Sequence, residues 1–179
     1  MMMRHPFALL VSLLALVGGG AWLLFHRDIE RVTVGSVAPD FTARDLRTSR
    51  NVSLHTEYAN TVTLLNIWGT WCGPCVKEMP AMDSLYRAFS ARGFRIAAVS
   101  VDEPSLDNVR KFVAEHQISF DVLNDSLGTI KTTYQTTGVP ESFLIDRTGH
   151  IIRIAQLAAP WNSPQNRRIV EELLAAPAR

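Results

Sequence analysis

Two cysteines three residues apart constrain this chain more than any other feature. They are Cys72 and Cys75, the only cysteines present, and they lie in the segment WGTWCGPC at residues 68–75. The continuous apolar run at 61–68 predicts a strand buried on both faces, and apolar residues at helical spacing follow from 74 to 92. The pair is therefore expected where a strand becomes a helix.

This position favours redox chemistry. Cys72 is expected at the helix N-terminus, where unpaired backbone N–H groups and the helix dipole lower the pKa of a thiol. The thiolate is the attacking species in disulfide exchange. Pro74 suits the first helical turn, and the spacing brings Cys75 back to the same end of the helix. The pair can open and close one disulfide, Cys72–Cys75, with Cys72 attacking and Cys75 resolving.

Three plainer explanations of the pair are weaker. A structural disulfide across four residues would stabilise the fold little, because loop-closure stabilisation grows with loop length. A structural zinc site needs four ligands, and the chain has no second CxxC and no closely spaced histidine pair. Coincidence is hard to reconcile with the strand-to-helix setting. We therefore expect neither a metal nor another cofactor.

The length and charge of the chain limit its architecture and its partners. With 179 residues, 47% of them hydrophobic, it is expected to form one globular domain beyond its N-terminal segment. The formal net charge is +1 without a long basic run, so nothing indicates nucleic-acid binding.

The N-terminal segment is predicted to meet a membrane. Residues 6–25 carry no charge, and about 20 apolar residues span a hydrocarbon core of roughly 30 Å. The small residues at 18–21 would suit signal cleavage, but 22–25 continue the apolar run. We therefore expect an uncleaved anchor at 1–27, a tether at 28–34 and the domain at 35–179. Basic residues flank both ends, so charge gives no firm orientation.

Periodicity and turn residues predict the remaining elements. Extended pieces at 35–41 and 51–54 around a polar turn at 44–50 suggest an N-terminal hairpin. Strands are expected at 94–101 and 120–123, helices at 105–116, 127–134 and 163–176, and an antiparallel hairpin at 142–146 and 150–155. These elements predict an α/β fold, with parallel strands first, an antiparallel hairpin last and helices on both faces.

Three motifs in order resemble a known family. They are GSVAPDF at 35–41, LNIWGTWCGPCVKEMP at 65–80 and GVPESFLID at 138–146. Together they resemble the thioredoxin-like superfamily, and more closely the TlpA/ResA/CcmG type of membrane-anchored thiol:disulfide oxidoreductase. The likeness covers about 34–176. It implies a thioredoxin-like fold, with a central mixed sheet flanked by helices and an N-terminal hairpin.

The resemblance also implies where a client protein binds. Val139–Pro140 is expected to be a cis peptide bond in a loop facing the cysteines. Val139 would contact an extended client segment through its N–H and C=O. A plain tight turn is the alternative for this loop. The residues expected to contact substrate are Trp71, Gly73, Pro74, Val139, Pro140 and Glu141.

Proton transfer needs a group other than Asn66. Cytosolic thioredoxins have a buried aspartate at the matching position, whereas the asparagine found here cannot exchange a proton. Glu78 follows Cys75 by one helical turn, where the family places a glutamate, so we assign it to catalysis as the proton carrier. A solvated Glu78 on the helix surface is the alternative. Glu141, after the expected cis-proline, is a second candidate.

The resemblance implies a thiol:disulfide oxidoreductase at the outer face of the cytoplasmic membrane. It would reduce disulfides of exported proteins, with apocytochrome c among the potential clients, and would take electrons from a membrane donor. Gly73-Pro74 is the dipeptide of the strong reductant thioredoxin. Three alternatives remain: a disulfide-donating oxidant, a thiol peroxidase, which shares the opening APDF, and a client-binding module without turnover.

Overall fold

The computed structural model describes residues 31–102 and 106–177. The anchor expected at 1–27 and residues 28–30 of the expected tether lie outside these residues. Within the described ranges, no helix combines the length and the apolar character that crossing a membrane requires.

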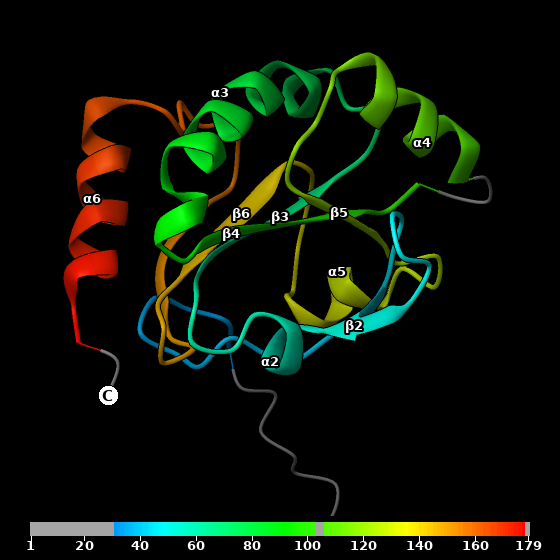
Figure 1. The fold of residues 1–179 in the computed structure, drawn as a ribbon. Helices are drawn as coiled ribbons and strands as arrows, with labels where there is room; N and C mark the ends of the chain where they lie inside the picture. Colours follow the sequence, from blue (N-terminus) through cyan, green and yellow to red (C-terminus); the bar gives the residue numbers. More distant parts are fainter. Residues whose placement is uncertain (1–30, 103–105, 178–179) are drawn as a thin grey trace, which may run out of the picture. The chain divides into compact units, whose positions relative to one another are not determined.

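A mixed sheet lies at the centre of the fold (Figure 1). Among the described residues its strands are β1 (Thr42–Asp45), β2 (Asn51–Ser53), β3 (Val62–Trp68), β4 (Phe94–Ser100), β5 (Asp121–Asn124), β6 (Glu141–Ile145) and β7 (Ile151–Ala155). Their order across the sheet is β2-β1-β5-β4-β3-β6-β7. The three central strands β5, β4 and β3 are parallel, and the outer strands pair antiparallel on both sides.

Helices cover both faces of this sheet (Figure 1). They are α2 (Leu54–Glu57), α3 (Gly73–Phe89), the short 3-10 helix η1 (Ser90–Arg92), α4 (Leu106–Glu115), α5 (Thr129–Thr133) and α6 (Pro164–Ala175). Side chains of α3, α4 and α6 pack in one hydrophobic cluster, while α2 and α5 pack in the other. The predicted α/β fold, with parallel strands followed by an antiparallel hairpin, is confirmed.

Strand β3 contributes to both clusters because successive side chains of a strand point to opposite faces. Leu64 and Trp68 join the cluster under α3, and Leu65 and Ile67 join the one on the other face. Every residue of β3 is buried, as the continuous apolar run predicts. Asn66 shares the face of Leu64 and Trp68, so its amide points toward α3.

The helix predicted at 74–92 forms with a small change at its end. It runs through Pro80 as expected, and its last predicted turn is the 3-10 helix η1. Gly93 follows at φ 97°, a left-handed conformation that glycine adopts without a steric penalty. The chain then enters β4 beside β3, which gives the predicted parallel crossover.

The N-terminal hairpin is present, but its predicted first strand is wrong. The first strand is β1 (Thr42–Asp45), not 35–41. The segment 35–38 instead runs beside β7, where Ala38 N–H donates to the Gly149 carbonyl at 2.8 Å. The turn shortens because the Asp45 carboxylate accepts the N–H groups of Arg47 and Thr48. Leu54 begins α2 rather than ending the second strand.

Candidate active site

The two cysteines lie where β3 passes into α3, as predicted. Cys72 is the N-cap residue of α3, and Pro74 occupies its first turn. The structure holds the pair as a disulfide, with the two Cα atoms 5.2 Å apart. The backbone N–H of Cys75 donates to Cys72 Sγ at 3.2 Å. This N–H would also stabilise a thiolate on Cys72 in the reduced protein.

The two sulfur-bearing residues differ in their access to solvent. In the disulfide form Cys72 is 5% exposed and Cys75 is fully buried. The residues around Cys72 are open: Trp71 is 67% exposed, and Gly73 and Pro74 are exposed as well. A client sulfur can therefore approach the pair only from the side of Cys72.

The loop before Cys72 is held by Asp102, a residue that sequence reasoning missed. The buried Asp102 carboxylate accepts the Thr70 N–H at 2.9 Å, the Thr70 hydroxyl, and the Ser100 hydroxyl at 2.7 Å. A Cβ on Gly69 would lie 2.8 Å from the Trp71 indole, so the ring lies against this bare backbone. Its position in the sequence could have indicated this role. Asp102 comes just after β4, and adjacent parallel strands such as β3 and β4 end at the same edge of the sheet, so Asp102 lies near the loop that follows β3.

The loop that the resemblance placed opposite the cysteines lies there. The Val139–Pro140 peptide bond is cis, as that likeness implies. The Val139 carbonyl oxygen is 3.5 Å from Cys72 Sγ. Beside it lies a groove of about 280 Å³, whose lining includes Trp71, Val101, Lys131 and Val139. Two of the predicted substrate contacts, Trp71 and Val139, thus share one groove next to Cys72 Sγ.

Glu78 is buried, which excludes the solvated alternative. Its Oε1 accepts from Asn66 Nδ2 at 2.9 Å, and its Oε2 accepts from the Ala159 N–H at 3.0 Å. Asn66 Nδ2 also donates to Ser142 Oγ on β6, whereas Asn66 Oδ1 is buried without a hydrogen-bond partner among the described residues. Burial raises the pKa of Glu78 above its ordinary value, and the donors from Ala159 and Asn66 only partly oppose this.

Glu141 is a second buried carboxylate at this end of the sheet. It follows the cis-proline, opens β6 and pairs with Ile67 of β3. Its Oε2 atom is buried without a hydrogen-bond partner among the described residues. Burial raises the pKa of Glu141, with partial opposition from neighbours that include Thr136 and Gln156. Both predicted proton carriers are therefore groups that burial drives toward the protonated form.

The loop between β7 and α6 was not identified from the sequence. Ala159 holds Glu78 through its backbone N–H, and Gln156 approaches Glu141. A backbone donor has no side-chain signature, and this one lies 81 residues from its acceptor. Ala159 reaches Glu78 because it packs in the same hydrophobic cluster as side chains of α3 and α6.

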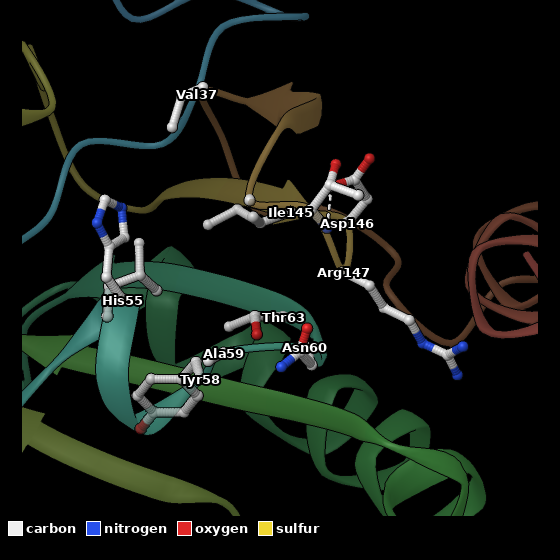
Figure 2. A pocket seen from close by; sticks show the side chains of 12 residues that line it. Val37, His55, Tyr58, Ala59, Asn60, Thr63, Ile145, Asp146 and Arg147 are labelled. Atoms are coloured by element: carbon white, nitrogen blue, oxygen red, sulfur yellow. Dashed lines mark hydrogen bonds between the residues drawn. The ribbon is translucent and has the colours of Figure 1, made fainter. Parts of the chain in front are cut away.

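A pocket of about 250 Å³ lies at the opposite end of the sheet (Figure 2). It is lined by Thr63 at the start of β3, Ile145 at the end of β6, and His55. Two of its polar side chains are engaged elsewhere: His55 Nε2 lies 2.8 Å from the Ala38 carbonyl oxygen, and Arg147 points away to the carbonyls at the end of α6. This pocket shares no residue with the disulfide.

Comparisons with known proteins agree with this geometry. The sequence model described as the AhpC/TSA family matches residues 34–154. The chain is 39% identical over 146 residues to the thiol-disulfide oxidoreductase ResA of Geobacillus thermodenitrificans, covering 82% of each protein. It is 36% identical over 146 residues to ResA of Bacillus thuringiensis, covering 80% of this chain and 83% of that protein.

Solved structures show the same fold. A putative thiol:disulfide interchange protein DsbE from Chlorobium tepidum superposes with a TM-score of 0.68 at 29% identity, covering 80% of this chain and 96% of its own. A putative protein disulfide isomerase from Bacteroides thetaiotaomicron gives a TM-score of 0.72 at 26% identity, covering 81% and 92%.

Proposed function

We propose, from the premise that this chain belongs to the AhpC/TSA family and is a thiol-disulfide oxidoreductase with a thioredoxin-like fold, that it reduces disulfides in exported proteins. The observation that carries this proposal is the asymmetry of the cysteine pair. Cys72 caps α3 at the edge of an open groove, while Cys75 is buried behind it beside a buried carboxylate. This is the arrangement that one attacking and one resolving thiol require.

The reaction consists of two exchanges. The Cys72 thiolate attacks one sulfur of the client disulfide, so that bond breaks, a mixed disulfide forms and the departing client sulfur takes up a proton. Cys75 then loses its proton and attacks Cys72 Sγ, which releases the second client thiol. The client gains two electrons and two protons, and the enzyme ends as the Cys72–Cys75 disulfide. A dithiol donor at the membrane would reduce it again.

Glu78 is the group that we propose for the Cys75 proton. It lies three residues after Cys75 on α3, and positions i and i+3 of a helix share a face. Burial raises its pKa toward the range in which a carboxylate works as a base near neutral pH. Trp71, Gly73, Pro74 and Val139 would border the client segment, with the Val139 backbone groups as hydrogen-bond partners.

Trapping tests the assigned roles. Cys75→Ser should accumulate a covalent complex with the client, because nothing resolves the mixed disulfide. Cys72→Ser should trap nothing. Equal trapping by both single variants would overturn the roles proposed for the pair. Mass spectrometry of the captured chain would also show whether apocytochrome c is a client.

The reducing direction rests on Gly73-Pro74 and is tested by the reduction potential. Potentials of thioredoxin-like proteins range from about −270 mV for thioredoxin to about −120 mV for the oxidant DsbA. Equilibration with glutathione should place this enzyme near the lower value. A potential near the upper value would instead identify a disulfide donor.

We propose that residues 1–27 anchor the domain beginning near residue 35 to the outer face of the cytoplasmic membrane. The support is the apolar run at 6–25 together with thiol chemistry that suits an exported site. An alkaline phosphatase fusion after Arg31 should be active and should sediment with membranes. Activity in a soluble fraction would favour a cleaved signal.

A further inference from the structure

Exposed leucines lie on both sides of the disulfide, at the same end of the sheet. Leu127 is 83% exposed and Leu157 is 77% exposed, more than any other large apolar side chain of the described residues. Leu127 comes three residues after the end of β5, and Leu157 two residues after the end of β7. Single exposed apolar residues need no explanation, but the placement of this pair does.

Sheet topology fixes that placement. Strand β5 is parallel to β4, which is parallel to β3, so β5 ends where β3 delivers Cys72. Strand β7 is antiparallel to β6, which is antiparallel to β3, so β7 also ends there. In the order β5-β4-β3-β6-β7, the two leucines thus follow strands two positions away from β3 on either side.

Both flanking turns are tied to the redox site by hydrogen bonds. On one side Asp125 N–H bonds to the carbonyl of Ser100, whose hydroxyl donates to the Asp102 carboxylate that holds Thr70. On the other side Ala155 pairs with Ser142, which accepts from Asn66. The backbone two residues before each leucine, at Asp125 and Ala155, is therefore tied to the elements that hold the redox site.

We propose that Leu127 and Leu157 bind apolar side chains of an unfolded client segment about three residues before and three residues after its cysteine. Neighbouring strands are about 4.8 Å apart, so the ends of β5 and β7, from which the two leucines follow, lie about 10 Å to either side of β3. Three extended residues at about 3.3 Å each can span that distance. The inference rests on the proposed function, because a client sulfur bonded to Cys72 fixes the centre of the segment.

The groove at Trp71 and Val139 supports this occupant. It adjoins Cys72 through the Val139 carbonyl, and its lining reaches Lys131 of α5, four residues after Leu127. An unfolded chain exposes leucine and valine side chains that a folded client buries. The site would therefore select client cysteines in apolar, unfolded segments, the state in which an exported chain first meets the membrane.

Nine-residue peptides test the proposal. Each holds a central cysteine as a mixed disulfide with 2-mercaptoethanol, with leucine or serine three residues before and after it. The pre-reduced full-length chain in detergent micelles reacts in a single turnover, releasing the peptide thiol and 2-mercaptoethanol while its own pair becomes the disulfide. The readout is the ratio of second-order rate constants for the leucine and serine peptides.

We expect a ratio of about ten for the wild type, from about threefold for each leucine that becomes partly covered. Leu127→Ser or Leu157→Ser should each lower the ratio about threefold, and the double variant should bring it near one. The matched control is Val37→Ser, which removes an exposed side chain, 54% exposed, at the opposite end of the sheet. It should keep the wild-type ratio.

Several results would overturn the inference: a wild-type ratio near one, an unchanged ratio in the double variant, or an equal loss in Val37→Ser. Moving the peptide leucines next to the cysteine should abolish the preference, and an undiminished preference would contradict the predicted span. Failure of the wild type to react with either peptide or with 2-hydroxyethyl disulfide would instead contradict the proposed function.

Discussion

Two regions of this molecule bury carboxylates, but only one of them supplies cationic partners among the described residues. Beneath the N-terminal hairpin, Asp121 of β5 receives Arg47 from the hairpin turn and Arg95 from β4, and Tyr58 donates to the same carboxylate. At the disulfide end, Glu78 and Glu141 are equally buried, yet no lysine or arginine of the described residues forms an ion pair with either.

The difference separates a carboxylate with a structural role, Asp121, from carboxylates suited to binding a proton, Glu78 and Glu141. Asp121 is buried between two guanidinium groups, and these ion pairs hold three segments together. A buried carboxylate with only neutral donors has a raised pKa and binds a proton more readily, which is useful near a thiol that must lose one. The fold therefore places stabilising pairs away from the cysteines and neutralisable acids beside them.

Asp121→Asn should have the largest effect in this comparison, and it should affect stability alone. Removing one partner of a buried pair costs about 3–5 kcal/mol when both groups are buried; we expect about 2–3 kcal/mol because Arg47 is mostly exposed. Urea unfolding of the oxidised protein measures the loss. A slowed disulfide exchange in the folded variant would show that the two regions are not separate.

Glu78→Gln should instead affect the rate of disulfide exchange. We expect disulfide exchange to slow by at least tenfold, a low bound on what a placed general base contributes, while the fold is kept because size and shape are unchanged. Insulin reduction from pH 5 to 9 gives the profile, with circular dichroism as the folding control. An unchanged pH–rate profile would remove Glu78 from proton transfer and move the search to Glu141.

The pH dependence of stability sharpens the contrast. The raised pKa of Glu78 does not change the free energy of unfolding at low pH, because Glu78 is protonated in both the folded and the unfolded state there. As pH rises through the ordinary value of 4.5, the unfolded state loses its proton first, so the folded state loses stability. Glu78→Gln should therefore become more stable relative to wild type as pH rises from 4 to 8, measured on the oxidised form.

Asp83 is the matched control for that measurement. Burial acts to raise its pKa, but hydrogen bonds from Ser119 and Arg87 hold it below its ordinary value. Its contribution to stability is present above the unfolded pKa and is lost as pH falls. Asp83→Asn should therefore lose stability relative to wild type as pH rises through this range, the opposite sign to Glu78→Gln. The same sign in both variants would contradict the assigned environments.

Glu141→Gln should give the smallest effect. Glu141 opposes Ile67, whose side chain packs on the sheet face away from α3, and it does not share the helix of Cys75. We therefore expect exchange to slow by about threefold at most, well below the hundredfold that a placed base supplies. The same insulin assay measures it. A larger loss than in Glu78→Gln would exchange the roles of the two acids.

Local patterns in the sequence predicted the frame of the site. The apolar run at 61–68, the helical spacing after Pro74 and the turn at Gly149 depend on neighbours within a few residues, and β3, α3 and the β6–β7 hairpin form where expected. The cis bond before Pro140 came from the likeness of its motif, not from composition. The misplaced first strand at 35–41 shows the limit, since its partner proved to be β7.

The sequence by itself determined which residues we propose for the chemistry: the cysteines at a strand-to-helix junction, an asparagine in place of an aspartate, and a glutamate one turn beyond Cys75. Only the tertiary structure decided how those groups behave. Glu78 is buried because Asn66 and Ala159, from segments distant along the chain, close over it, and Asp121 is paired because the hairpin brings Arg47 to it. Desolvation and charge pairing depend on what surrounds a group in space, which spacing along a chain does not specify.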